Sequence, residues 1–82
     1  MAAPDDLHER LLALSAETLE VAPGQLTAQA LLSDDLGIDS LAAIEWGMTI
    51  EDAFGVVIAE GDWVDVVSYG AVEDLVRRLA AA

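Results

Sequence analysis

The residues with the clearest chemical potential lie in the stretch Asp34–Leu41, which reads Asp-Asp-Leu-Gly-Ile-Asp-Ser-Leu. Asp39 is a favourable helix N-cap and Leu41 begins an apolar stripe, so a helix is predicted to begin at or beside Ser40. Gly37 frees the backbone just before this cap. Because a helix N-terminus has unpaired N–H groups and roughly half a positive charge, it favours a phosphate on a residue there. The Ser40 hydroxyl is therefore predicted to be an attachment point.

This motif resembles the attachment motif of the acyl carrier protein family, which has the form Asp-x-Leu-Gly-x-Asp-Ser-Leu. The resemblance covers nearly the whole chain, because matching positions continue on both sides of the motif: Leu7, Leu11, Leu14, Leu19, Leu26, Leu32, Glu45, Ile50, Glu51, Phe54, Gly55 and Ile58. It implies an all-α fold, a small acyl-carrier-like bundle of three main helices plus one short helix. It also implies that Ser40 carries 4′-phosphopantetheine covalently, added from coenzyme A by a phosphopantetheinyl transferase, with Asp39 as the flanking cap. Such a protein is a carrier and not an enzyme.

Length and composition predict a single acyl carrier domain over residues 1–82. The chain has no cysteine, so any thiol chemistry requires an added group. The longest strongly apolar stretch, residues 56–59, is too short to span a bilayer, and no secretory signal is visible, so a cytoplasmic location is expected. High acidity and Met1 favour a discrete carrier, and the lack of lysine with abundant alanine favours a bacterial source.

The charge balance is strongly acidic, with 16 acidic residues against three arginines and a formal net charge of −13. Nine acidic residues and no basic residue lie in one part of the chain: Asp34, Asp35, Asp39, Glu45, Glu51, Asp52, Glu60, Asp62 and Asp65. Such a field repels nucleic acid and anionic membranes and attracts basic protein surfaces. The expected partners are basic-faced biosynthetic enzymes, such as a ketosynthase, an acyltransferase or a ligase, and the chain is expected to be a monomer. The alternative is that the acidity serves solubility alone.

The N-terminal part of the chain has the apolar spacing of an amphipathic helix over residues 5–21. Its stripe is formed by four leucines: Leu7, Leu11, Leu14 and Leu19. His8 and Arg10 lie off this stripe and are predicted to be exposed surface residues. Pro23 and Gly24 are predicted to stop the helix.

The remaining connections and the last helix are predicted from their apolar residues. The connection over residues 21–39 is expected to pack onto the core through its leucines: Leu26, Leu31, Leu32 and Leu36. Residues 60–69 are predicted to form a short irregular helix or turn, since a strand at Val66 and Val67 would have no partner. A last helix from Ser68 or Gly70 to Leu79 is predicted to bury its apolar residues: Val72, Leu75, Val76 and Leu79.

The helix predicted over Ser40–Phe54, with Gly55 as its C-terminal stop, has two apolar faces. The inner face is predicted to pack on the bundle: Ala43, Trp46, Gly47, Ile50 and Phe54. The outer face combines apolar and acidic residues and is predicted to bind partners: Leu41, Ile44, Glu45, Met48, Glu51 and Asp52. An apolar patch ringed by acids has the composition of a docking surface. The alternative is a central helix buried on all sides, which the carboxylates beside Met48 disfavour because unpaired buried charges are costly.

Other functions find little support in the residues. An enzyme with Ser40 as nucleophile would need an adjacent base, and the sole histidine, His8, lies on a different predicted helix. A calcium loop beginning at Asp34 would have Leu36 and Ile38 at ligand positions, so the acids cannot build that site. An unmodified helical interaction domain remains the alternative to a carrier.

The cargo is predicted from three departures from the family pattern. Trp46 and Gly47 replace the usual aliphatic residues of the second helix, and Trp63 lies in the uncertain short helix. The pair Trp46-Gly47 either shapes an acyl cavity or packs in the core. These aromatic residues favour a polyketide or specialised fatty acid pathway. The alternative is an aminoacyl or peptidyl carrier of nonribosomal peptide synthesis.

Overall fold

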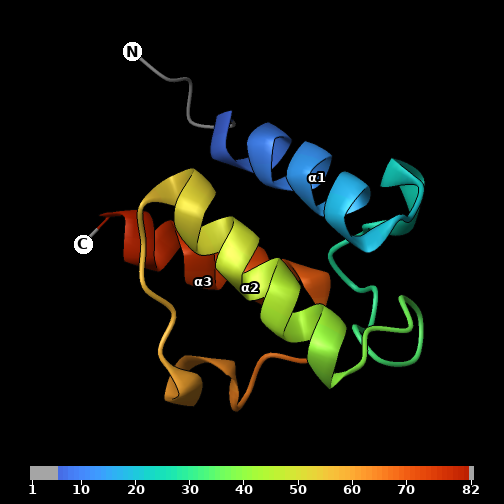
Figure 1. The fold of residues 1–82 in the computed structure, drawn as a ribbon. Coiled ribbons are helices and arrows are strands. Elements are labelled where there is room, and N and C mark those ends of the chain that lie inside the picture. Colours follow the sequence, from blue (N-terminus) through green and yellow to red (C-terminus); the bar gives the residue numbers. More distant parts are fainter. Residues whose placement is uncertain (1–5, 82) are drawn as a thin grey trace.

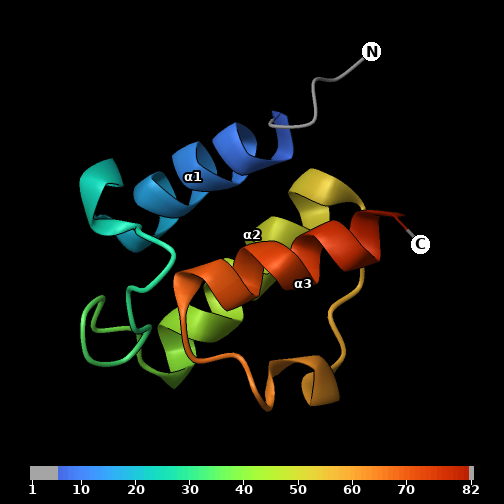
Figure 2. The same cartoon turned by 180° about the vertical axis from the view of Figure 1, so that it is seen from behind.

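The computed structural model describes residues 6–81, which form the predicted all-α bundle (Figure 1). The helices are α1 (Asp6–Leu19), α2 (Ser40–Phe54) and α3 (Tyr69–Ala81). Two single 3-10 turns lie at Pro23–Gln25 and Glu60–Trp63. Both α2 and α3 begin at the end of the bundle where residues 20–39 lie, whereas α1 runs towards that end (Figure 2). Among the described helices, none combines the length and the apolar composition needed to cross a membrane.

The end of α1 differs slightly from the prediction, because the helix stops at Leu19 and not at Val21. Glu20 adopts a left-handed conformation with φ of 56°, and the Val21 N–H donates to the Ala16 carbonyl at 3.1 Å. This arrangement closes the last turn of a helix. Pro23 instead begins the 3-10 turn Pro23–Gln25.

The core lies between the three helices and contains side chains that are fully buried: Leu11, Trp46, Ile50, Val72, Leu75 and Val76. Trp46 is fixed there by its indole Nε1, which donates to the buried Ser15 Oγ at 2.9 Å. The Trp46 ring also stacks on Tyr69, with centroids 6.3 Å apart and an interplanar angle of 12°. Trp46 therefore packs in the core, as one of the two alternatives expected.

Tyr69 places a hydroxyl in this core. The residue is 1% exposed, and its hydroxyl has no hydrogen-bond partner among residues 6–81. Burial raises the pKa of Tyr69 to about 12, an effect that the nearby Ser15 side chain opposes in part. The neutral form of this phenol is thus strongly favoured in the folded chain.

The long connection between α1 and α2 packs mainly as predicted, with one exception. Leu26 is buried, and Leu32 and Leu36 are half-buried, but Leu31 is 39% exposed. Leu31 remains outside the core because it forms an isolated antiparallel bridge with Ser68 at the surface.

The segment before α3, which was expected to have no pairing partner, pairs with the connection between α1 and α2. The Leu32 N–H donates to the Val67 carbonyl at 3.0 Å, so Val67 pairs with the first connection. Gly70 continues this contact, since a Cβ there would lie 2.9 Å from the Ala28 carbonyl oxygen. The predicted short helix over residues 60–69 is correspondingly shorter and spans Glu60–Trp63, because the residues that follow pair with the loop.

Arg10 is exposed and the His8 side chain is 45% exposed, as predicted, and both residues also contact other helices. His8 Nδ1 pairs with Glu73 of α3. The Arg10 guanidinium lies 4.7 Å from the Phe54 ring centroid and donates to the Ala53 carbonyl at 2.9 Å, at the end of α2. A cation is favourable at a helix C-terminus, so Arg10 stabilises that end of α2.

Candidate attachment site and docking face

Ser40 is the first residue of α2 and is exposed. Asp39 caps the helix as predicted, since its Oδ1 accepts the Ala42 N–H at 2.8 Å and its carbonyl accepts the Ala43 N–H at 2.9 Å. The N–H groups of Ser40 and Leu41 have no acceptor among residues 6–81. A phosphodiester on the Ser40 hydroxyl would therefore meet two free donors and the positive end of the helix dipole.

The loop before Ser40 is fixed by its own hydrogen bonds. The Asp35 carboxylate accepts the Leu31 N–H at 2.8 Å, and the Ile38 N–H donates to the Leu32 carbonyl at 2.9 Å. Gly37 has φ of +64°, a conformation that a side chain would strain. This loop holds Ser40 at the rim of the molecule with its hydroxyl accessible, which fits a covalently attached arm.

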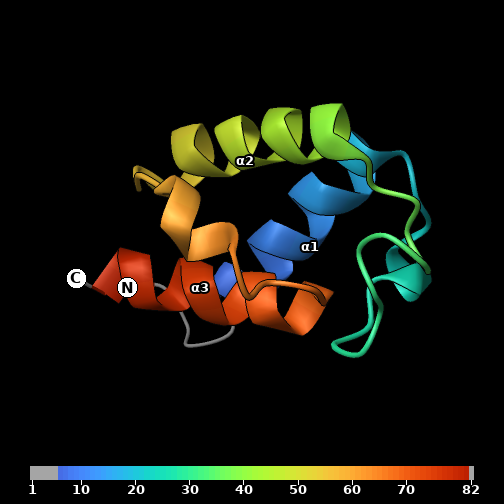
Figure 3. The same ribbon diagram turned by 90° about the horizontal axis from the view of Figure 1, so that it is seen from below.

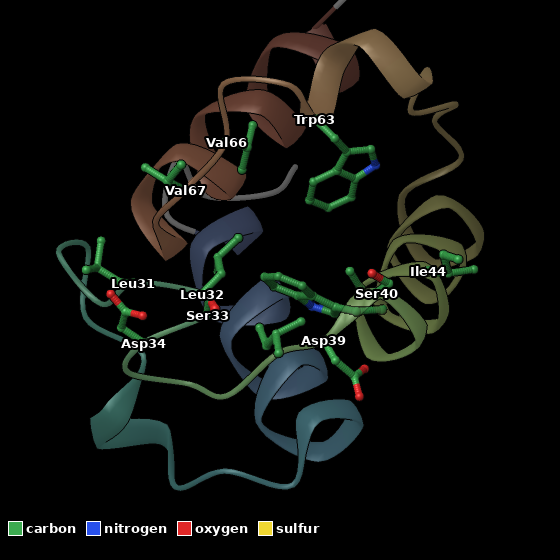
Figure 4. A pocket seen from close by; sticks show the side chains of 13 residues that line it. Leu31, Leu32, Ser33, Asp34, Asp39, Ser40, Ile44, Trp63, Val66 and Val67 are labelled. Atoms are coloured by element: carbon green, nitrogen blue, oxygen red, sulfur yellow. The ribbon is translucent and has the colours of Figure 1, made fainter.

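A cavity of about 580 Å³ opens beside Ser40 between α2 and the segment that precedes α3 (Figure 4). We call it the Ser40 groove, and it is lined by residues of α2 and of both connections: Leu31, Leu32, Ser33, Asp34, Ile38, Asp39, Ser40, Ala43, Ile44, Trp46, Trp63, Val66 and Val67. Its lining is mainly apolar. Val66 and Val67 were not predicted to belong to a site, because neither residue is part of a periodic pattern.

The outer face of α2 is exposed along its length (Figure 3). Leu41, Ile44 and Met48 are 65%, 60% and 60% exposed, so the alternative of a helix buried on all sides is wrong. Glu45 and Asp52 are exposed beside them. Their face thus has the apolar and acidic composition predicted for docking.

Glu51 differs from the other acids of the outer face. It is half-buried, and its Oε2 accepts the Ile58 N–H at 2.8 Å. The carboxylate therefore holds the segment that leaves α2. Its second role in partner binding stays a prediction.

The fold brings His8 no closer to a role as the base of a Ser40 nucleophile, and it builds no metal site from the described residues. His8 pairs with Glu73 and does not line the Ser40 groove. Within residues 6–81, no group of three or more histidine, cysteine, aspartate or glutamate side chains is arranged to hold a metal ion.

Similarity to known proteins identifies the family of this chain. Residues 9–79 match the family described as a phosphopantetheine attachment site. The chain is 30% identical over 78 residues to a protein of Thermotoga maritima named acyl carrier protein, covering 95% of this chain and 96% of that one. It is 35% identical over 81 residues to an acyl carrier protein of Saccharopolyspora erythraea, covering 94% and 85% of the two chains. The chain therefore belongs to the acyl carrier protein family, whose members are carriers and not enzymes and hold phosphopantetheine covalently on a serine.

Proposed function

We propose that Ser40 is the modified serine and that residues 1–82 form one monomeric, cytoplasmic carrier domain. The observation that carries the assignment is an exposed hydroxyl at the capped start of α2, beside two free N–H groups and an apolar groove. On modification, the Ser40 oxygen forms a bond to the phosphorus of phosphopantetheine, the pyrophosphate bond of coenzyme A breaks with release of adenosine 3′,5′-bisphosphate, and the serine proton is lost to a base or to water. The arm then supplies a thiol, which this cysteine-free chain lacks.

Modification at Ser40 is tested by mass. Incubated with a phosphopantetheinyl transferase and coenzyme A, the protein gains one arm, and Ser40→Ala gains none. Ser33→Ala is the matched control, since Ser33 is exposed and also lines the groove but lies outside the helix start. A modified Ser40→Ala protein would contradict the assignment.

The outer face of α2 is the proposed docking surface for basic enzymes. Glu45→Lys and Met48→Asp slow acyl transfer with a retained helical circular dichroism spectrum, and the charge reversal acts mainly on the association rate. Glu17→Lys, an equal charge change at an exposed position of α1, serves as control. Unchanged transfer kinetics in both test variants remove this face from the proposal.

We assign the cargo to a polyketide or specialised fatty acid pathway, because the lining of the Ser40 groove includes two aromatic rings, Trp46 and Trp63, together with polar residues. The experiment loads the arm in native lysate and identifies the thioester by mass. An aminoacyl thioester would instead support the peptidyl carrier alternative.

A further inference from the structure

Two hollows follow one another along α2, and Trp63 borders both. The Ser40 groove is the first. The second, which we call the Gly47 hollow, has a volume of about 280 Å³ and is lined further along the helix: Ala43, Ile44, Gly47, Met48, Glu51, Ile58, Glu60 and Trp63. Ala43, Ile44 and Trp63 belong to both linings, and of these only Trp63 comes from outside α2. Its indole is therefore the side chain that faces α2 where the hollows meet.

Gly47 lets the indole approach the helix backbone. A Cβ at this position would lie 3.3 Å from Trp63 Cζ2, so the ring rests where a side chain of α2 would otherwise begin. Gly47 is itself buried. The Trp63 ring therefore contacts the helix at Gly47, beside the residues that the two linings share.

Trp63 is held by packing and by a local turn. The turn is closed by the Asp62 N–H to the Ala59 carbonyl at 2.9 Å and by the Ala59 N–H to the Asp62 carboxylate at 2.9 Å. Within the described chain, the Trp63 indole N–H has no hydrogen-bond partner. Removing the ring therefore leaves no buried acceptor unpaired, and the anchors on both sides of the turn, at Ile58 and Val67, remain.

We propose that Trp63 is a specificity-determining residue, a partition that confines an apolar chain attached through Ser40 to the Ser40 groove. This inference rests on the proposed function, because the chain must enter from Ser40. Figure 4 shows the ring on the segment that faces α2 across the groove, where a chain growing away from Ser40 would reach it. With Trp63 removed, the Gly47 hollow becomes a continuation of the groove.

The test loads Ser40 with straight-chain acyl-pantetheine arms of increasing length and records the melting temperature of each product. Buried methylenes stabilise the fold, so the melting temperature rises with length until the groove is filled and then levels off. Trp63→Ala moves this plateau to longer chains by roughly one two-carbon unit or more, since a large-to-small substitution opens space. Val64→Ala, next to Trp63 but outside both linings, keeps the wild-type plateau.

The outcomes separate this inference from the proposed function. Failure of Ser40 to accept any arm contradicts the proposed function, whereas normal loading with the same plateau in wild type and Trp63→Ala overturns the partition. Should Trp63→Ala fail to fold, Trp63→Leu keeps an apolar contact on Gly47 with less volume, and its plateau decides in the same way. A melting temperature independent of chain length in every variant also overturns the inference.

Discussion

Trp46 and Trp63 both line the Ser40 groove, with ring centroids 6.3 Å apart, yet their surroundings differ in almost every respect. Trp46 is fully buried, donates to Ser15 and stacks on Tyr69. Trp63 is half-buried on a single 3-10 turn and rests on Gly47 through apolar contact. The Trp46 wall of the groove, on α2, is therefore part of the core. The Trp63 wall, on the segment before α3, packs onto this core from outside. We therefore assign the stability of the fold to the Trp46 wall and the proposed selectivity for chain length to the Trp63 wall.

The largest expected difference between these walls is in stability. Trp46→Ala is expected to lower the free energy of unfolding by about 3–5 kcal/mol, because it leaves a cavity in the core and an unpaired Ser15. Trp63→Ala is expected to cost less, about 1 kcal/mol, since the side chain is only partly buried and the substitution breaks no hydrogen bond among the described residues. Urea denaturation of both variants measures the two values. Equal losses would contradict the division between the walls.

The buried Tyr69 hydroxyl makes the free energy of unfolding depend on pH in the alkaline range. The folded pKa of Tyr69, about 12, lies above the ordinary value of 10.0, so the unfolded chain releases this proton first. The stabilisation is complete below pH 10 and is lost as the pH rises through 12, with a total on the order of 2 kcal/mol. The sequence has one tyrosine and neither lysine nor cysteine, so no other such side chain obscures the titration. The free energy of unfolding is measured against pH for the wild type and for Tyr69→Phe. The wild type is expected to lose stability between pH 10 and 12, and the variant is expected not to show this loss.

The Trp46 anchor itself is tested by a smaller change. Ser15→Ala is expected to lower stability by about 1–2 kcal/mol, because the buried indole N–H loses its acceptor. In Trp46→Phe the same serine substitution is expected to cost less, since the donor is already absent. A double-mutant cycle by urea denaturation measures the coupling, and a coupling of zero would show that packing alone holds the ring.

The acidic segment gives the smallest effect. Nine acids and no base lie between residues 34 and 65, and such self-repulsion destabilises a compact chain. Raising sodium chloride from about 0.01 M to about 0.1 M shortens the screening length from roughly 30 Å to roughly 10 Å. The melting temperature of the unmodified protein is therefore expected to rise by a few degrees. A flat or falling melting temperature would show that the carboxylates are compensated locally.

The helix boundaries that the sequence predicted correctly are those with a local chemical signal. Asp39 and Gly55 mark the two ends of α2, and the structure has a side-chain cap at one and a left-handed φ of 64° at the other. The end of α1 was wrong because Glu20, a residue without special conformational freedom, adopts the left-handed turn. The local hydrogen bond from the Val21 N–H to the Ala16 carbonyl closes the helix there, and no residue type in the sequence marks that position.

The residues of the candidate site divide in the same way, into those with a local signal in the sequence and those without one. The exposed stripe on α2 follows from helical periodicity together with the carboxylates beside Met48, which is why Leu41, Ile44 and Met48 were placed correctly. Ser15 follows Leu11 by four residues on the apolar side of α1, a signal for a buried hydroxyl that the sequence analysis missed. The second wall of the groove depends on pairing between segments distant in sequence, such as Leu32 with Val67, and spacing does not encode that pairing.

The closeness of the two indoles gives this protein a built-in optical reporter. Tyr69 stacks on Trp46, and the ring centroids of Trp46 and Trp63 are 6.3 Å apart, so excitation energy passes among the three rings and part of the emission comes from the partly exposed Trp63 ring. A chain entering the groove changes the solvent around that ring and hence its emission wavelength. Fluorescence of the unlabelled protein, read against Trp63→Leu, would then follow loading and unloading of the arm in real time.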